Sequence, residues 1–250
     1  MNAQENNGER IAKVLARLGL ASRREAEKLV SEGRVTVDGQ VVTNLATRLS
    51  GEEDVRFDGE RLGAKDRVRM WRYHKPSGLV TTHKDPQGRP TVFEKLPPEL
   101  PRVLSVGRLD LTTEGLLLLT NDGGLSRKLE LPATGWKRRY RVRAYGRVSE
   151  KALEDLKSGL TVEGVTYGPI DAKLDKQQGG NVWLTVSITE GKNREVRNIM
   201  RSLGLTVNRL IRVAYGPFQL GALKEGQAEE IPRKVLVDQL GKSIAAELGL

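Results

Sequence analysis

The spacing of apolar residues divides this sequence into two parts. Up to residue 57 the pattern is that of two short helices followed by a hairpin, whereas from Val68 onward it becomes a mixture of strands and helices. A polar stretch that contains glycine, residues 58–66, separates the two parts. We therefore expect a small module at 9–57, a linker at 58–66 and a larger domain at 67–240.

The small module carries clear local signals. Ser22 and Glu25 have the spacing of a capping box, which predicts that the second helix begins there. Asp38 and Gly39 form a tight-turn dipeptide, so residues 35–42 are expected to be two short strands. Basic side chains recur along the helices and are candidates for phosphate contacts in RNA: Arg10, Lys13, Arg17, Arg23, Arg24 and Lys28.

The larger part favours an α+β fold. Apolar residues alternate in 140–145 and 182–188, as in half-buried strands, and residues 103–109 and 116–120 also have strand character. The second of these is expected to close with a turn at 121–124. Helical spacing returns at 196–203. Because the strands follow no regular βαβ order, we predict a largely antiparallel sheet.

Composition narrows the class of partner. The formal net charge of +10 points to an anionic partner, which would be RNA, DNA or anionic lipid. No apolar stretch approaches the roughly 18 to 20 residues that span a bilayer, and the N-terminal residues lack the apolar segment of a signal peptide. We therefore expect a cytoplasmic protein without a membrane partner. The absence of cysteine excludes disulfides, thiolate nucleophiles and cysteine-based zinc sites.

Residues 107–115 contain the first candidate for chemistry. If Arg108 and Asp110 lie at the end of a strand, their side chains share one face, which places a cation beside a carboxylate. The plainer interpretation, which these residues alone favour, is that Asp110 begins a turn and Arg108 is solvated.

Two further segments are basic. Arg194, Arg197 and Arg201 have helical spacing and would form a stripe that could hold phosphate or pair with a carboxylate, although a solvated face is the simpler reading. Residues 137–143 combine dense positive charge with Tyr140, whose ring could stack on an extruded base. A tyrosine of the core or of a sheet edge fits Tyr140 equally well.

Taken in order, these segments resemble a known family. Residues 10–20, 22–26 and 33–39 resemble the S4 RNA-binding domain. The rest looks like the catalytic domain of ribosomal RNA pseudouridine synthases, above all the branch that acts on the large subunit, and four segments carry this resemblance: 73–76 with 85–93, 107–115, 137–140 and 190–197. The resemblance covers most of residues 10–233.

The resemblance implies a role for each matching residue. Asp110 matches the catalytic aspartate, Tyr140 the tyrosine that packs on the uracil, and Arg197 the basic residue that pairs with the aspartate. Arg108 would help to hold the space left by the extruded nucleotide, and Val196 would shield the pocket. Further expected RNA contacts are Arg194, Lys137, Arg138 and Arg139.

The implied reaction isomerises a uridine, with ribosomal RNA, 23S in particular, as partner. It requires no cofactor and no metal, and a monomer is the default. Whether Asp110 bonds to the sugar or promotes an elimination stays open. Two other functions are alternatives. One is a catalytically silent RNA-binding or ribosome-assembly protein, and the other is a methyltransferase, for which no glycine-rich nucleotide loop is present.

A metal site is not expected. The candidate ligands His74, His83 and Asp85 lack the spacing of a metal site and are expected in loops.

Overall fold

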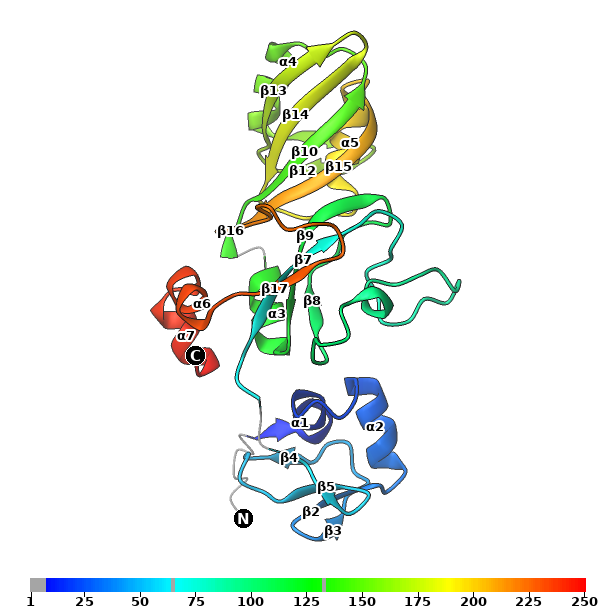
Figure 1. Cartoon of the computed structure of the whole chain (residues 1–250), viewed down its shortest axis with the longest axis vertical. Helices are drawn as coiled ribbons and strands as arrows, with labels where there is room; N and C mark the ends of the chain where they lie inside the picture. The colour runs from blue at the N-terminus through cyan, green and yellow to red at the C-terminus, as the bar shows by residue number, and fades with distance from the viewer. Residues whose placement is uncertain (1–7, 64–65, 132–133) are drawn as a thin grey trace. The chain divides into compact units, whose positions relative to one another are not determined.

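The computed structural model describes residues 8–63, 66–131 and 134–250. The chain forms two compact units, Met1–Arg67 and Val68–Leu250 (Figure 1). Within the described residues, no helix has both the length and the apolar character needed to cross a membrane.

The first unit contains two helices and short strands. Its elements are β1 (Glu9–Arg10), α1 (Ile11–Arg17), α2 (Arg23–Ser31), β2 (Val35–Val37), β3 (Gln40–Val41), β4 (Arg48–Leu49), β5 (Val55–Phe57) and β6 (Glu60–Arg61). The capping box is present, because Ser22 Oγ accepts from the Glu25 N–H and Glu25 accepts from the Ser22 N–H. The predicted hairpin forms as β2 and β3.

Part of the expected linker is ordered in this unit. Asp58 and Gly59 turn the chain between β5 and β6, which pair antiparallel. The prediction of a linker was therefore wrong for residues 58–61, since a second tight turn of the same Asp-Gly type builds another hairpin there.

The second unit is built on one large sheet. Its strands are β7 (Met70–Lys75), β8 (Leu104–Val106), β9 (Thr113–Thr120), β10 (Arg138–Tyr145), β11 (Leu160–Val162), β12 (Val165–Tyr167), β13 (Asp171–Gln178), β14 (Asn181–Ile188), β15 (Thr206–Tyr215), β16 (Phe218–Gln219) and β17 (Ala228–Glu230). The main order is β13-β14-β10-β15-β9-β7-β17, with β16 on β15 and β8 on β9. Only the β15–β9 pair is parallel among the described strands of this sheet, so the predicted α+β fold with a largely antiparallel sheet is confirmed.

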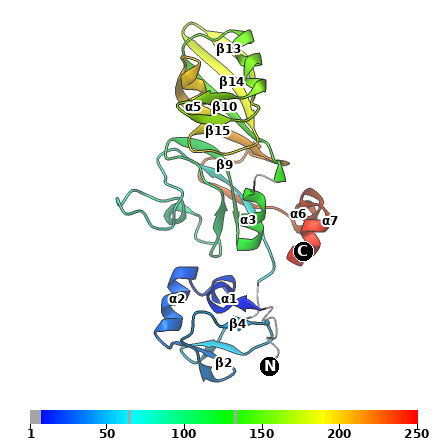
Figure 2. The same ribbon diagram turned by 180° about the vertical axis from the view of Figure 1, so that it is seen from behind.

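Helices pack against the sheet from both sides of β9. They are η1 (Phe93–Lys95), α3 (Gly123–Glu130), α4 (Glu150–Asp155), η3 (Leu156–Ser158), α5 (Glu195–Ser202), α6 (Arg233–Leu240) and α7 (Lys242–Leu248) (Figure 2). Leu117 and Leu119 belong to the core that α4 and α5 complete, whereas Leu116 and Leu118 belong to the core of α3 and α6. The four-leucine run is therefore buried on both faces of its strand.

Strand β10 is covered on one face only. Its side chains alternate between buried and exposed along the whole strand, with Tyr140, Val142 and Ala144 buried and Arg141 and Arg143 exposed. This alternation matches the period predicted from the sequence.

Three predicted boundaries were wrong. Residues 121–124 do not simply close a strand, because the Asp122 carboxylate accepts from the Gly124 and Leu125 N–H groups and so caps α3. The strand expected at 103–109 is shorter, since Gly107 adopts a φ of 68° directly after β8. The second unit also continues beyond residue 240, because α7 packs against the core of α3 and α6.

Candidate active site

Asp110 begins a β-turn that the surrounding backbone holds in place. Its carbonyl accepts from the Thr113 N–H at 3.0 Å. Before it, Thr81 Oγ1 donates to the Leu109 carbonyl at 2.9 Å, and after it the Leu111 carbonyl accepts from the Gly78 N–H at 2.8 Å. The turn interpretation of Asp110 is therefore correct, and the alternative that Asp110 lies at the end of a strand is not.

The buried side chain of Lys75 holds this turn through hydrogen bonds to backbone carbonyls. The ammonium of Lys75 donates to the carbonyls of Pro76 (2.9 Å), Leu111 (3.3 Å) and Thr113 (2.9 Å). Burial lowers the pKa of Lys75 to about 8, while the charges of Asp110 and Glu114 act in the opposite direction. The protonated side chain has as many carbonyl acceptors as it has N–H groups, so it can fix the turn through backbone contacts.

A close backbone approach brings β15 to the same place. Gly115 pairs with Arg212 in the parallel ladder and has a φ of 101°. A Cβ atom at this position would lie 2.3 Å from the Arg212 carbonyl oxygen, so only glycine fits.

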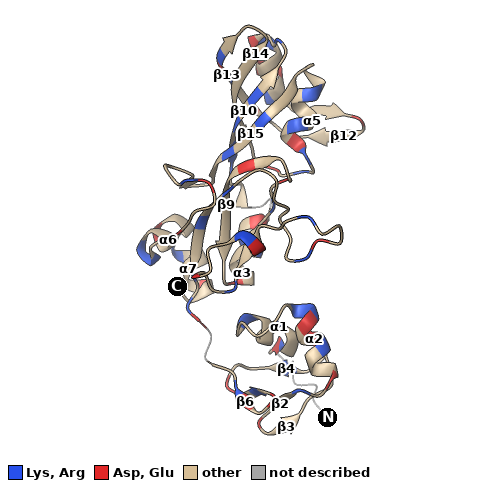
Figure 3. Ribbon diagram, turned by 45° about the vertical axis from the view of Figure 1, so that its right-hand side comes forward, with Lys and Arg blue, Asp and Glu red and all other residues tan. Residues whose placement is uncertain are grey.

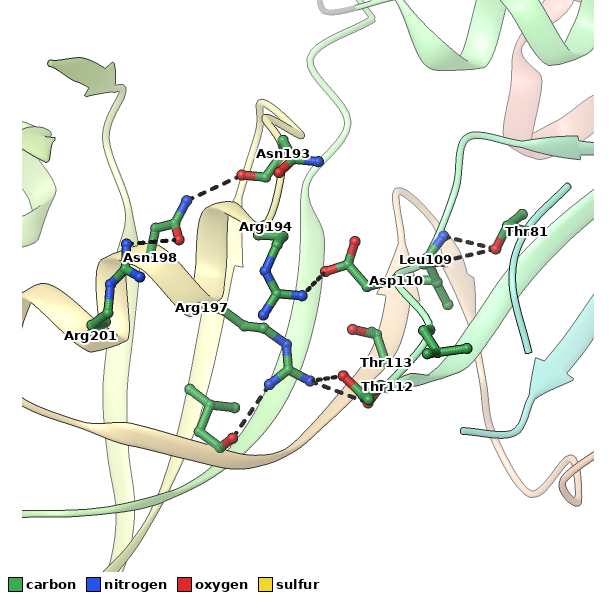
Figure 4. A network of polar contacts seen from close by, with 12 residues as sticks. Thr81, Leu109, Asp110, Thr112, Thr113, Asn193, Arg194, Arg197, Asn198 and Arg201 are labelled. Atoms are coloured by element: carbon green, nitrogen blue, oxygen red, sulfur yellow. Dashed lines mark hydrogen bonds and ion pairs between the residues drawn. The ribbon is translucent and has the colours of Figure 1, made fainter. Parts of the chain in front are cut away.

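Arg194 makes the direct ion pair with Asp110. Its Nη1 lies 3.5 Å from Asp110 Oδ2 (Figure 4), and the Asp110 side chain is 32% exposed. Arg194 precedes α5 and has a left-handed backbone with φ 50°, a conformation that a residue other than glycine rarely adopts. Backbone strain of this kind tends to occur at functional sites.

The expectation that Arg197 pairs with the aspartate was wrong for this structure. The Arg197 guanidinium donates to the Thr112 carbonyl (3.2 Å), to Thr112 Oγ1 (3.0 Å) and to the Val207 carbonyl (3.3 Å). Burial, followed by the charge of Arg194, lowers the pKa of Arg197, and Asp110 partly offsets both effects. Arg197 therefore holds the turn that carries the carboxylate. It does not contact the carboxylate itself.

The three predicted arginines of α5 do not act as one stripe. Arg194 contacts Asp110 and Arg197 contacts the turn, whereas Arg201 pairs with Glu163 at 3.0 Å. The helix begins at Glu195, so Arg194 lies outside it. Its side chain points toward Asp110 and does not continue the row of Arg197 and Arg201.

A cavity of about 1220 Å³ opens at this point. It exceeds the roughly 300 to 1000 Å³ of common small-molecule pockets. The predicted site residues that line it are Arg108, Asp110, Arg138, Tyr140, Arg194 and Val196. Tyr140 is only 8% exposed, and Arg108 is exposed and forms no ion pair within the described residues. Arg197 is not among the lining residues.

Arg212 also lines the cavity, and sequence reasoning missed it. It lies opposite Tyr140 in the antiparallel ladder and is 3% exposed. Its Nε donates to the Leu116 carbonyl at 2.8 Å, its guanidinium lies over the Tyr215 ring, and its buried Nη2 has no partner. Burying an arginine without a carboxylate partner lowers the stability of the fold. Its presence in the cavity therefore points to a functional role. The available signal was an arginine at an apolar position of an alternating segment.

Arg138, an expected RNA contact, lines the cavity but is largely enclosed by protein. It is 7% exposed, and its guanidinium donates to the carbonyls of Trp136 and Thr189 and to the Tyr215 hydroxyl. Hydrogen bonds to other parts of the protein therefore occupy the Arg138 guanidinium. Lys137 and Arg139 are exposed, as RNA contacts require.

The predicted basic residues of the first unit, where Figure 3 colours every Lys and Arg blue, differ in whether they have an acidic partner. Lys13 and Arg17 both pair with Glu9, and Lys28 lies 3.5 Å from Glu32. The remaining three predicted residues are exposed and form no ion pair within residues 8–63: Arg10, Arg23 and Arg24.

The three residues considered for a metal have other partners. His74 lies in β7, not in a loop, and its Nδ1 is 2.7 Å from the Leu223 carbonyl. His83 stacks on Phe93. Hydrogen bonds from Arg89 lower the pKa of Asp85 to about 2. In the part of the chain that the structure describes, no cluster of three His, Asp or Glu side chains could hold a metal ion.

Comparison with known proteins connects this geometry to a family. Residues 9–55 match the S4 domain, and residues 69–202 match the RNA pseudouridylate synthase family. An uncharacterized RNA pseudouridine synthase of Rickettsia felis is 48% identical over 91% of this chain and 99% of its own length. Ribosomal large subunit pseudouridine synthase B of Salmonella typhi is 44% identical over 85% of this chain and 75% of its own length.

A solved structure supports the same assignment. The crystal structure of a pseudouridylate synthase covers 93% of this chain and 100% of that protein, with a TM-score of 0.64 and 27% identity. The agreement extends across both the S4 domain and the large sheet. This chain therefore belongs to the RNA pseudouridylate synthase family, as a member with an S4 domain ahead of the catalytic domain.

Proposed function

We propose that this RNA pseudouridine synthase modifies a uridine of 23S ribosomal RNA and uses Asp110 as its catalytic carboxylate. The observation that carries the proposal is a carboxylate at the mouth of a large cavity, 3.5 Å from Arg194, in a cavity that Tyr140 also lines. The similarity to a synthase named for the large ribosomal subunit supports the choice of 23S RNA.

The reaction explains why these groups are needed together. It breaks the glycosidic bond between C1' and N1, rotates the uracil and rejoins it through C5. Since the reacting atoms are hidden in a stacked base, the nucleotide must leave the stack at a cost of a few kcal/mol. Phosphate contacts from exposed cations such as Arg108 offset this cost.

Each residue then has a defined part. Asp110 acts at the sugar, either as a nucleophile or by promoting elimination, and Arg194 pairs with its carboxylate. Tyr140 packs on the uracil, and Val196 excludes water. Arg197 positions the turn through Thr112.

The same proposal includes the assembly and the place of action. We take a monomer as the working enzyme, because the chain carries its own S4 RNA-binding domain beside the catalytic domain. A ribosomal RNA substrate places its action in the cytoplasm. The exposed cations of the S4 domain would add phosphate contacts in a structured stem: Arg10, Arg23 and Arg24.

Asp110→Asn tests the catalytic role. We expect a folded protein that binds 23S transcript normally and forms pseudouridine at least about a thousandfold more slowly, because the amide carries no charge. Tritium release from RNA labelled at uracil C5 measures the rate. Asp238→Asn, which removes an exposed carboxylate on α6, is the matched control and should retain full activity.

Two outcomes would count against this proposal. Normal turnover by Asp110→Asn would remove the aspartate from the mechanism. A wild-type protein that binds the transcript but modifies no uridine in it would instead be a silent RNA-binding protein.

A further inference from the structure

The face of the sheet turned away from the cavity carries a regular array of side chains. Tyr140, which lines the cavity, is on the buried face of β10, so the alternate residues of that strand lie on the opposite face. The antiparallel register of β13, β14 and β10 places them in four cross-strand rows: Asp171 with Ser187 and Arg139, Lys173 with Thr185 and Arg141, Lys176 with Trp183 and Arg143, and Gln178 with Asn181 and Tyr145.

This sheet face is open to solvent. The alternate residues of β10 are all exposed, and those of β13 in the same rows are exposed as well. The helices α4 and α5 contribute to the core that contains Val142, Leu184 and Val186, which is the opposite side. The bare face therefore extends across three neighbouring strands.

Most cations of this face have no carboxylate partner. Arg139, Arg141, Arg143, Lys173 and Lys176 form no ion pair within the described residues. Asp175 accepts a hydrogen bond from Thr185, and Asp171 is the other carboxylate on these strands. At the β15 margin, Arg209 is paired with Glu114 and Glu225. Positive charge is therefore concentrated on β10 and at Lys173 and Lys176.

Aromatic rings lie among these cations. The Arg141 guanidinium is 5.0 Å from the centre of the Trp183 ring, and Arg143 is the cross-strand neighbour of Trp183. Tyr145 is 62% exposed and covers Gly180, where a Cβ atom would lie 2.5 Å from its ring. Each ring is held in position by a neighbour, which lowers the entropy cost of stacking a base on it.

We propose that this face of β13, β14 and β10 binds a single-stranded segment of the RNA substrate. The proposal rests on the proposed function, because it takes ribosomal RNA as the ligand. Unpaired arginines and lysines suit phosphates, and exposed ring faces suit bases that are not already paired. A duplex offers only its backbone to such a surface, so the aromatic rings favour a single strand.

The first experiment removes charge from the face and compares it with equal removal elsewhere. Arg141→Gln/Arg143→Gln is tested against Arg233→Gln/Lys234→Gln, which removes two exposed cations from α6 without touching the sheet. Both pairs are made in Asp110→Asn protein so that no turnover occurs. The probe is a fluorescent oligouridylate of about 12 nucleotides, a length within the usual range for single-strand sites.

We expect the Arg141/Arg143 variant to bind the probe about tenfold more weakly. The slope of log affinity against log salt should become shallower by about 1.4, since each lost phosphate contact contributes about 0.7 for a single strand. The α6 variant should change neither quantity by as much. Arg141→Lys/Arg143→Lys keeps the charge and should restore the slope.

A second measurement locates the contact directly. Probe that contains 5-iodouridine should crosslink under ultraviolet light to Tyr145 or Trp183, and an excess of unlabelled single strand should compete better than a duplex of the same length. Crosslinking that a duplex suppresses equally well would overturn the choice of single-stranded RNA.

Two results would overturn the whole proposal. One is an equal loss of affinity in both double variants, which would mean general electrostatic attraction. The other is crosslinking that bypasses Tyr145 and Trp183 entirely, for example crosslinking confined to Tyr140 in the cavity. Neither readout depends on pseudouridine formation, so failure of the catalytic proposal would be seen separately, in the tritium-release assay.

Discussion

The two halves of the large sheet differ in how many faces they bury. Around β9, leucines pack into one core on each side, and the adjoining strand β7 even buries a lysine. Around β10, only one face is covered, and the other presents arginines and aromatic rings to solvent. A single sheet thus contains a closed half and an open half.

This difference shows where precision and where adaptability are needed. In the closed half, Lys75 and Gly115 fix the turn of Asp110, because buried backbone groups must find partners. In the open half, charged side chains retain freedom to follow an RNA chain. The candidate active site lies where the halves meet, along the parallel pairing of β9 and β15.

The sharpest test of the comparison substitutes one glycine in each half. Gly115→Ala would place a Cβ atom 2.3 Å from the Arg212 carbonyl, so we expect a loss of more than about 3 kcal/mol in the free energy of unfolding. Gly179→Ala, at φ 59° with open space around it, should cost only about 1 kcal/mol. Urea unfolding of both variants measures the difference. Equal losses would show that the closed half is not the more rigid one.

The next test separates the two arginines at the junction. Arg197→Gln removes half-buried contacts to Thr112 and Val207, and we expect roughly a hundredfold loss of kcat as the turn loosens. Arg194→Gln removes an ion pair that is partly exposed, and a loss of only a few-fold is expected. Arg201→Gln, on the exposed side of α5, is the control and should keep normal turnover. A larger loss in Arg194→Gln would identify that ion pair as the essential one.

The smallest expected effect is a dependence on pH that originates at Lys75. Its folded pKa of about 8 means that the ammonium is present below pH 8 and is lost as the pH rises through that value. Turnover should therefore fall several-fold between about pH 7 and pH 9, as the side chain loses its positive charge and one of the three N–H groups that hold the turn.

Stability should change in the opposite direction over the same range. An unfolded lysine keeps its proton to about pH 10.4, so the folded chain binds fewer protons between pH 8 and pH 10, and the free energy of unfolding rises with pH there. Rates and urea midpoints of wild type and Lys75→Met would be compared. Identical pH profiles for the two proteins would exclude Lys75 as the source.

Local signals in the sequence predicted much of the fold. Three features depend on residues that are close together in the sequence: the capping box of Ser22, the turn at Asp38 and the alternation of β10. Such short-range patterns act through hydrogen bonds and side-chain direction that neighbours alone decide. The order of motifs then identified the family and pointed to Asp110.

Errors arose where a distant partner decides the outcome. Asp122 looked like a turn residue, but its carboxylate caps a helix because that helix has a core to pack against. Arg138 looked like its exposed neighbours Lys137 and Arg139, but its guanidinium donates to the Thr189 carbonyl and the Tyr215 hydroxyl. Charge density alone does not tell which arginine is enclosed.

By itself, the sequence determined the family, the α+β class and the aspartate to examine. Only the tertiary structure decided which arginine meets that aspartate, which lysine holds its turn and that Arg212 faces the same cavity. The physical reason is the parallel pairing of β9 with β15, two strands that are far apart along the chain. Contacts across such a distance follow from the packing of the whole sheet, so no local pattern of residues encodes them.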